Sequence, residues 1–79
     1  MFTHIFQNGL KVIFTHDDGD EWICRNCGSE NEDEDIIILD YQNKKVITCR
    51  NCDRIKILTL FGFSLEDANR LEHEIYAMV

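Results

Sequence analysis

Apolar and polar residues along the first part of the chain predict a β-hairpin. Strand-forming segments lie on either side of Asn8-Gly9, a dipeptide that favours a two-residue hairpin turn because both residues accept positive φ. Such a turn pairs Ile5 with Val12, and it leaves large apolar side chains on both faces of the hairpin. We therefore expect other elements to pack on both faces of residues 1–15.

Three later segments predict further strands, and β-branched residues dominate the first two of them. Residues 36–41 and 46–48 lie on either side of a polar turn at residues 42–45 and read as a second hairpin. Residues 55–61 also have the composition of a strand. Residues 36–39 and 57–61 are apolar on both faces, so part of this surface is predicted to contact a partner or a second copy of the chain.

Residues 64–79 carry the one helical pattern in the sequence. Ser64 can cap the N-terminus, and the acidic residues that follow it complement the helix dipole. Apolar residues then recur at steps of three and four, which places them on one stripe. The stripe consists of Leu65, Ala68, Leu71, Ile75 and Met78. We expect it to pack on the sheet; the alternative is a free helix that occupies a partner's groove.

Four cysteines form two C-x-x-C pairs, Cys24 with Cys27 and Cys49 with Cys52. Each pair can direct two sulfurs at one point, and two such pairs make the tetrahedral four-sulfur site that Zn²⁺ prefers. The sequence therefore predicts one zinc ion per chain. Disulfides are the alternative. No basic and apolar leader precedes the cysteines, which favours a reducing cytoplasm and a metal site.

This arrangement resembles the zinc-ribbon (zinc β-ribbon) family, in which a C-x-x-C-G turn, a long hairpin, a second C-x-x-C and a final strand follow one another. The resemblance covers residues 21–61 and implies that the four cysteines are the zinc ligands. Asp53 departs from the family pattern, because a glycine commonly follows the second pair. A helix directly after that pair would instead favour a treble-clef finger.

Together these elements predict one domain over residues 1–79, a small metal-bound α+β fold that is mostly β. It comprises the N-terminal hairpin over 1–15, the zinc ribbon over 21–61 and one C-terminal helix over 64–79. A chain of this length buries only about 60% of its unfolded surface, so its core alone is marginal. We therefore expect metal binding and folding to be coupled.

Acidic residues give the chain a formal net charge of −7. Such a charge repels nucleic acid and anionic membranes overall, so we expect no membrane association. The acidic segment that follows the first cysteine pair is either a solvated loop or a contact surface for a basic partner. The candidate protein contacts are Glu32, Asp33, Glu34 and Asp35, with the apolar Leu58 and Phe61.

Basic residues gather around the second cysteine pair, which provides a second functional hypothesis. A local basic patch could contact phosphates despite the overall charge. The candidate nucleic-acid contacts are Arg25, Lys44, Lys45, Arg50, Arg54 and Lys56. No ladder of aromatic residues accompanies them.

No catalytic constellation is present in the sequence, and four thiolates leave no open metal position for water, so we predict no enzyme. We expect a cytoplasmic, zinc-stabilised acidic module that acts as a protein-binding adaptor or regulator, for example of transcription or translation machinery. A homodimer is a further expectation. The alternative is a nucleic-acid-binding zinc ribbon. A rubredoxin-like iron electron carrier ranks third, because rubredoxins are similar small acidic proteins, but the cysteine turns here lack their typical proline and second glycine.

Overall fold

The structure is a computed structural model that describes residues 2–16, 21–32 and 35–78. The elements within these ranges confirm a small, mostly β α+β fold. In chain order they are β1 (Phe2–Ile5), β2 (Lys11–His16), β3 (Glu21–Ile23), β4 (Glu30–Glu32), β5 (Asp35–Tyr41), β6 (Lys44–Thr48), α1 (Arg54–Leu60) and α2 (Leu65–Met78).

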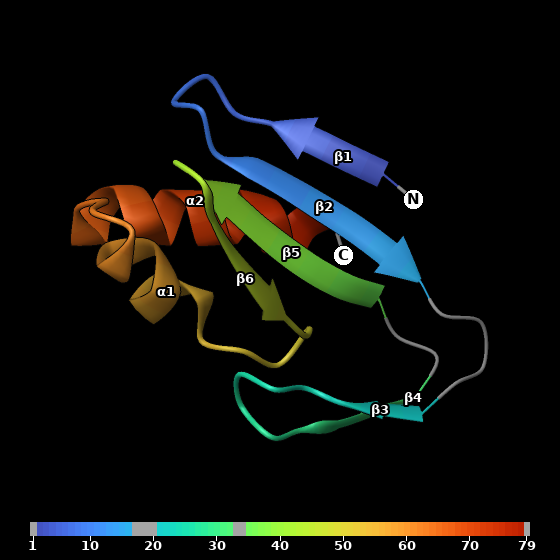
Figure 1. The fold of residues 1–79 in the computed structure, drawn as a ribbon. Coiled ribbons are helices and arrows are strands. Elements are labelled where there is room, and N and C mark those ends of the chain that lie inside the picture. The colour runs from blue at the N-terminus through green and yellow to red at the C-terminus, as the bar shows by residue number, and fades with distance from the viewer. Residues whose placement is uncertain (1, 17–20, 33–34, 79) are drawn as a thin grey trace.

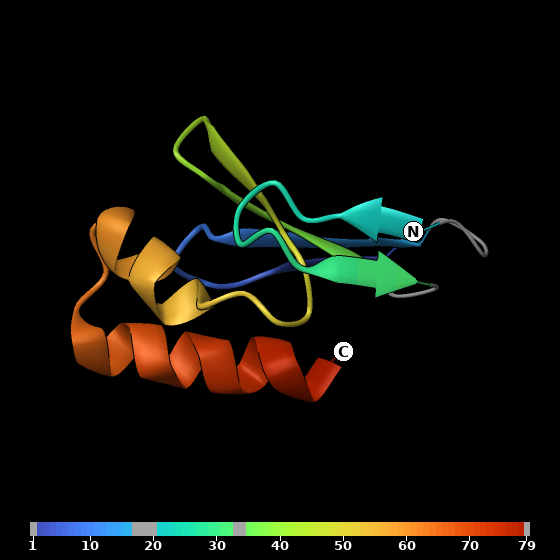
Figure 2. The same ribbon diagram turned by 90° about the horizontal axis from the view of Figure 1, so that it is seen from below.

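The strands form two antiparallel sheets. The larger sheet has four strands in the order β1-β2-β5-β6, and the smaller sheet pairs β3 with β4. Both helices pack on the same face of the larger sheet, as Figures 1 and 2 show from two directions. The β3–β4 hairpin lies near the end of the larger sheet where β6 finishes (Figure 1).

The main core lies between the larger sheet and the helices. Along β2 and β5 every second side chain points to this face and is buried, as expected for a sheet that is covered on one face. The buried set is Leu10, Val12, Phe14, Ile37, Leu39, Ile57, Leu58, Ala68, Leu71 and Ile75. On the opposite face, Ile13, Ile38 and Ile47 are in register across three strands, and Ile47 is 49% exposed.

The N-terminal hairpin forms with a register that differs by one residue from the prediction. Ile5 lies opposite Lys11, whereas the two-residue turn placed it opposite Val12. The loop is longer than the predicted two-residue turn. The Phe6 amide donates to the Leu10 carbonyl at 2.8 Å, and this hydrogen bond closes the loop. A one-residue shift changes every cross-strand pair, so the predicted pairing was wrong although the hairpin was right.

Two features of the turn stabilise the longer loop. Gly9 has φ +95° and its amide donates to the Phe6 carbonyl at 3.0 Å, the arrangement of a three-residue loop that ends in a glycine. Asn8 Oδ1 accepts a hydrogen bond from the Leu10 amide at 3.0 Å. The Asn-Gly signal therefore specified a turn, and the asparagine side chain stabilises the longer loop.

The segment predicted as the final strand is a helix. α1 covers Arg54–Leu60, so residues 55–61 form no strand, and the described chain has two helices where we predicted one. The β-branched residues favour a strand locally, but as a helix the segment buries Ile57 and Leu58 in the main core. A seven-residue helix is stable only through such packing.

Asp53 explains how α1 begins. Its φ of −81° is an ordinary value, and its carboxylate accepts a hydrogen bond from the Lys56 amide at 3.3 Å as the N-cap. The position therefore needs no glycine, and the departure from the zinc-ribbon pattern belongs to the start of a helix.

Two other predictions fare better. Ser64 Oγ accepts from the Asp67 amide at 3.2 Å and caps α2, whose buried residues belong to the predicted stripe, although Leu65 is 64% exposed. The second hairpin turns at Gln42 and Asn43, both at positive φ, so the lysines that follow lie in β6. Within the described chain, neither helix has the length and apolar character that a bilayer crossing requires.

Candidate metal centre

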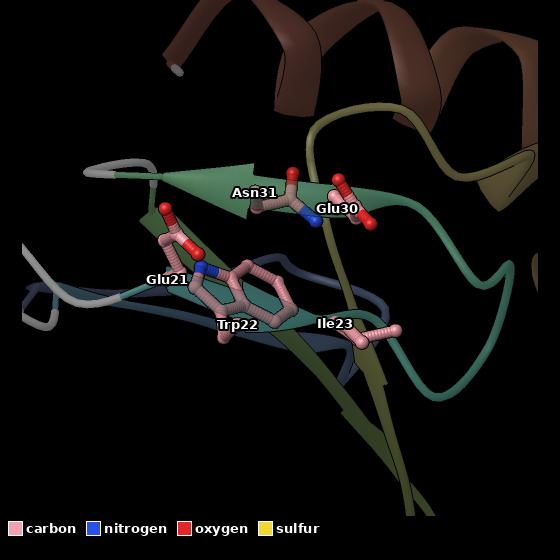
Figure 3. Close-up of a pocket in the computed structure, with 5 residues that line it drawn as sticks. All are labelled: Glu21, Trp22, Ile23, Glu30 and Asn31. Atoms are coloured by element: carbon pink, nitrogen blue, oxygen red, sulfur yellow. The ribbon is translucent and has the colours of Figure 1, made fainter.

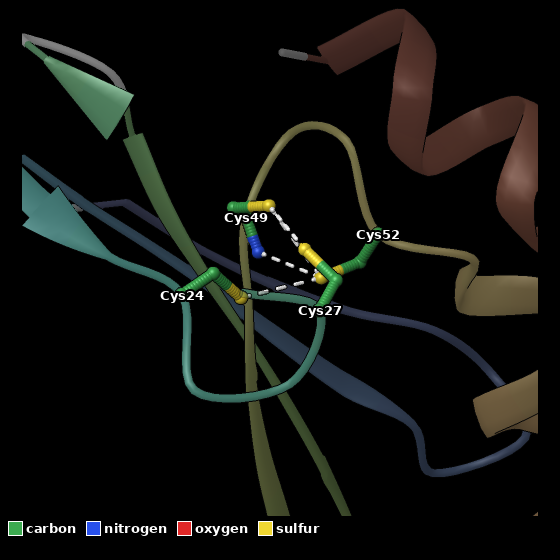
Figure 4. A group of neighbouring side chains, drawn as sticks. All are labelled: Cys24, Cys27, Cys49 and Cys52. Atoms are coloured by element: carbon green, nitrogen blue, oxygen red, sulfur yellow. Dashed lines mark hydrogen bonds between the residues drawn. The ribbon is translucent and has the colours of Figure 1, made fainter. Parts of the chain in front are cut away.

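The first cysteine pair, Cys24 and Cys27, lies in the turn that joins β3 to β4. The Gly28 amide donates to the Cys24 carbonyl at 2.8 Å, and the Cys24 amide donates to the Ser29 carbonyl at 2.9 Å. Gly28 has φ +78°, which a residue with a side chain rarely adopts. This tight turn directs both sulfurs toward the sulfurs of Cys49 and Cys52 (Figure 4).

The second cysteine pair, Cys49 and Cys52, connects the end of β6 to the start of α1. The Cys52 amide donates to the Cys49 carbonyl at 3.3 Å, and the Arg54 amide donates to the Cys52 carbonyl at 3.1 Å. The turn thus leads directly into the helix. A β-hairpin and a helix start therefore fix the position of the second pair.

The four Sγ atoms form one cluster, in which all lie within 4.8 Å of one another (Figure 4). Sγ–Sγ distances are 3.4 Å for Cys24–Cys52, 3.4 Å for Cys27–Cys49 and 3.5 Å for Cys49–Cys52. None of the four is in a disulfide. Zn–S bonds of about 2.3 Å place tetrahedral sulfurs about 3.8 Å apart. The sulfur cluster therefore fits one tetrahedral metal ion, which the four cysteines would hold.

Hydrogen bonds from N–H groups converge on two of these sulfurs. Cys52 Sγ accepts from the Cys49 amide at 3.3 Å and from Asn26 Nδ2 at 3.4 Å. Cys49 Sγ accepts from the Asn51 amide at 3.4 Å. Such bonds stabilise thiolates and orient ligands around a metal. The asparagines of the two C-x-x-C turns thus have a structural role.

The thiols differ in acidity because their surroundings differ. Hydrogen bonds with the side chain and the backbone of Ser29 lower the pKa of Cys27 to about 6, and this thiol is exposed. Burial, followed by the hydrogen bond to Cys27, raises the pKa of Cys49 to about 12. Burial also raises the pKa of Cys52. A metal ion must therefore displace protons from Cys49 and Cys52.

Arg54 connects the second cysteine pair to α2. Its guanidinium is 1% exposed; Nε donates to Glu72 Oε1 at 2.8 Å and Nη1 donates to the Cys49 carbonyl at 2.5 Å. Nη2 donates to the Arg50 carbonyl at 3.4 Å. The prediction that Arg54 contacts nucleic acid is thus wrong, because burial and the ion pair leave it inaccessible to phosphate.

The other candidate phosphate contacts are exposed but dispersed. Lys44 and Lys45 lie at the start of β6, whereas Arg50 follows the far end of that strand. Lys45 is the cross-strand partner of Asp40, which also pairs with Lys11, so acidic and basic groups alternate there. Arg25 and Lys56 are exposed on the first cysteine turn and on α1. The structure does not gather these cations on one strand end or turn.

The candidate protein contacts are also separated by the structure. Leu58 is completely buried in the main core, so its assignment to a contact surface is wrong. Phe61 is partly buried, and its ring centroid lies 6.1 Å from that of Tyr41. Glu32 ends β4 and Asp35 begins β5, while residues 33–34 lie outside the described part of the chain.

The sequence analysis missed Glu72 and Trp22, which shape this region, and it gave Arg54 a different role. Arg54 immediately follows the second cysteine turn, and Glu72 adjoins the buried Leu71, so a buried pair could have been sought there. Trp22 packs against the buried cysteines and precedes the first pair by two positions. An aromatic residue so close to metal ligands is a signal of a small satellite core.

Comparisons with protein-family models, with curated proteins and with solved structures find no match of any of the three kinds. The four-cysteine cluster on a small, mostly β fold is consistent with a zinc ribbon. The helix directly after the second pair is the feature expected of a treble-clef finger. The metal centre itself is common to both arrangements.

Proposed function

We propose that this chain is a zinc-stabilised interaction module that binds a basic protein partner, as an adaptor or regulator. The observation that carries the proposal is the sulfur cluster, in which four free thiols converge on one point. Four sulfur ligands complete a tetrahedron and leave no position for water or substrate. The metal then has a structural role, and we infer no catalytic one.

Zinc is the proposed metal, and iron is the alternative because both ions accept four thiolates. The cysteine turns lack the proline and second glycine typical of rubredoxins, which supports zinc. Elemental analysis of the purified protein should give one zinc ion per chain. A red protein with thiolate-to-iron absorption would contradict the assignment, because a zinc site is colourless.

Charge supports a protein partner over nucleic acid. The formal charge of −7 opposes association with a polyanion and favours encounter with a basic surface. Burial of Arg54 removes one of the cations that the alternative requires, and the remaining cations are dispersed. We propose no membrane contact.

A charge-matched capture experiment tests the proposed partner class. The zinc-loaded chain is immobilised, and a second bait carries Glu32→Gln, Asp33→Asn, Glu34→Gln and Asp35→Asn. We expect the native bait to retain a basic protein from nuclease-treated lysate, and the neutralised bait to retain less. Retention that requires nucleic acid, or that is equal for both baits, would contradict the proposal.

A further inference from the structure

A hollow on the smaller sheet belongs to the metal centre. Figure 3 shows its lining residues on β3 and β4. Trp22 and its cross-strand partner Asn31 lie on the face that packs against the buried cysteines, whereas Glu21, Ile23 and Glu30 alternate to the other face. The two sets point in opposite directions, so this hollow offers no joint site for one ligand.

The outer edge of β1 is a different surface, at the far side of the larger sheet from β6 and the second cysteine pair. No described element lies beside this edge (Figure 1). The Phe6 amide donates to the Leu10 carbonyl, so the alternation of an antiparallel ladder turns the backbone N–H and C=O groups of Thr3 and Ile5 outward. These groups are available to a further strand.

β1 lacks the features that usually keep an edge strand from pairing. Natural proteins place lysine, other charged residues or proline on such strands. β6, the opposite edge, has the exposed Lys44 and Lys45, whereas β1 has no lysine, arginine, carboxylate or proline. Phe2 is 55% exposed and Ile5 is 65% exposed. An apolar edge without these features suits the addition of a strand.

A hollow of about 590 Å³ lies beside this edge, between the N-terminal hairpin and α2. His4 and Phe6 line it from the hairpin, and Arg70, Leu71 and Glu74 line it from α2. The rings of His4 and Phe6 are 4.6 Å apart in an edge-to-face arrangement, so the hairpin side of the hollow is aromatic. An aromatic side chain on an added strand could pack there.

Charge favours a second copy of the chain as the source of that strand. All 15 acidic residues follow position 16, and Lys11 is the one lysine or arginine before it. Two chains of net charge −7 repel each other, but β1 can meet β1 of another copy without opposing carboxylates. A basic segment, in contrast, would find no carboxylate on β1 with which to pair.

We propose that two copies of the chain pair through β1, antiparallel and across a two-fold axis at His4. Thr3 of each copy then exchanges backbone hydrogen bonds with Ile5 of the other, and the two larger sheets become continuous. The same register places Phe2 of each copy opposite Phe6 of the other. Phe2 points to the helix face, because its cross-strand partner is the buried Phe14, so its exposed ring covers the hollow of the second copy.

This inference concerns the chain itself and is independent of the basic partner proposed above. Sedimentation equilibrium of the zinc-loaded protein tests it. Every protein compared carries Ile47→Lys, which places a charge on the sheet face opposite the helices and so opposes association through that face. We expect a monomer–dimer equilibrium in this background.

Two variants act on the edge itself. Thr3→Pro removes an outward N–H and leaves the pairing with β2 intact, because proline is tolerated where the N–H of an edge strand faces solvent. Phe2→Ala removes the ring that covers the hollow. Each should raise the dimer Kd about tenfold or more. Leu65→Ala removes a side chain that is 64% exposed on α2, and as the matched control it should change the Kd less than twofold.

NMR of a mixture of isotope-labelled and unlabelled protein should show contacts between Phe2 of one copy and Phe6 of the other. A protein that stays monomeric at millimolar concentration, or a dimer that Thr3→Pro and Phe2→Ala leave unchanged, would overturn the inference. Amide shifts of Thr3 and Ile5 that appear only with a captured basic protein would assign the edge to that partner and would also overturn it. Dispersed amide spectra confirm that the compared variants are folded.

Discussion

Arg54 Nε lies 2.8 Å from Glu72 Oε1, and this ion pair joins the helix that follows the second cysteine pair to the C-terminal helix. The same guanidinium donates to the carbonyl of Cys49. One buried side chain therefore contacts both the peptide backbone of Cys49 and the side chain of Glu72 in α2, the helix that packs on the main core. The packing of α2 and the geometry of the sulfur cluster are linked through it.

Loss of the carboxylate should weaken the fold. Glu72→Gln leaves the 1%-exposed guanidinium of Arg54 without its charged partner, so we expect the free energy of unfolding to fall by about 1–3 kcal/mol. Urea denaturation of the zinc-loaded protein measures the change. Glu66→Gln, at an exposed position of the same helix, should change stability by about 0.5 kcal/mol or less. Equal effects would show that the ion pair adds nothing.

Metal removal should unfold the chain. The sulfur cluster connects the β3–β4 hairpin to the larger sheet, and a domain of 79 residues has a small core. We expect chelation to remove the dispersion of the amide NMR spectrum, and Cys49→Ser to resemble the metal-free protein. A well-dispersed spectrum from metal-free native protein would refute the coupling.

Cys27 should be the first cysteine to react in the zinc-loaded protein. It is exposed, whereas Cys24, Cys49 and Cys52 are at most 6% exposed. With zinc bound, all four sulfurs are held as thiolates, so exposure decides which of them an alkylating reagent reaches first. Alkylation by iodoacetamide, followed by peptide mass spectrometry, should therefore label Cys27 first. Simultaneous labelling of all four cysteines would indicate global opening and would contradict the assigned order.

Binding to nucleic acid should be weak and strongly salt-dependent. The dispersed cations and the charge of −7 allow only non-specific contacts, for which we expect Kd on the order of 10⁻⁴ M or weaker at physiological salt. Fluorescence anisotropy with labelled DNA and RNA measures this. Sub-micromolar, sequence-selective binding that Lys44→Glu, Lys45→Glu and Arg50→Glu abolish would support the alternative function.

The face of the larger sheet opposite the helices should cause self-association at high concentration. Ile47 is 49% exposed on this face, and its cross-strand neighbour is Ile38. Ile47→Lys should lower the association seen by sedimentation and leave the fold intact, because the side chain is not in the main core. A protein that is strictly monomeric at all concentrations would contradict this expectation.

Local chemistry explains which parts of the fold could be predicted from the sequence. The two C-x-x-C turns fix their ligands within four residues, so the metal site follows from spacing alone. Ser64 and the apolar stripe after it likewise specify α2, because capping and helical periodicity act within a few turns.

Long-range packing decided the parts that were wrong. Ile55 and Thr59 favour a strand, yet burial of Ile57 and Leu58 against α2 and the sheet selects a helix. Arg54 looks like a phosphate ligand until Glu72, eighteen positions away, is brought beside it. Trp22 and Asn31 are cross-strand partners because β3 pairs with β4. The acidic sequence of β4 does not predict a strand, so this pairing could not be foreseen.

The chain leaves the larger sheet after His16 and returns at Asp35, and these two residues are cross-strand partners. The first cysteine pair therefore lies in a segment, the branch between residues 16 and 35, whose two ends are brought together when β2 pairs with β5. The second pair lies between two neighbours along the chain, β6 and α1. During folding, local contacts can form each half of the metal site before the halves meet, and the ion then closes one long-range contact. Shortening or lengthening the branch between residues 16 and 35 should accordingly alter the rate of metal capture more than the pairing of β2 with β5.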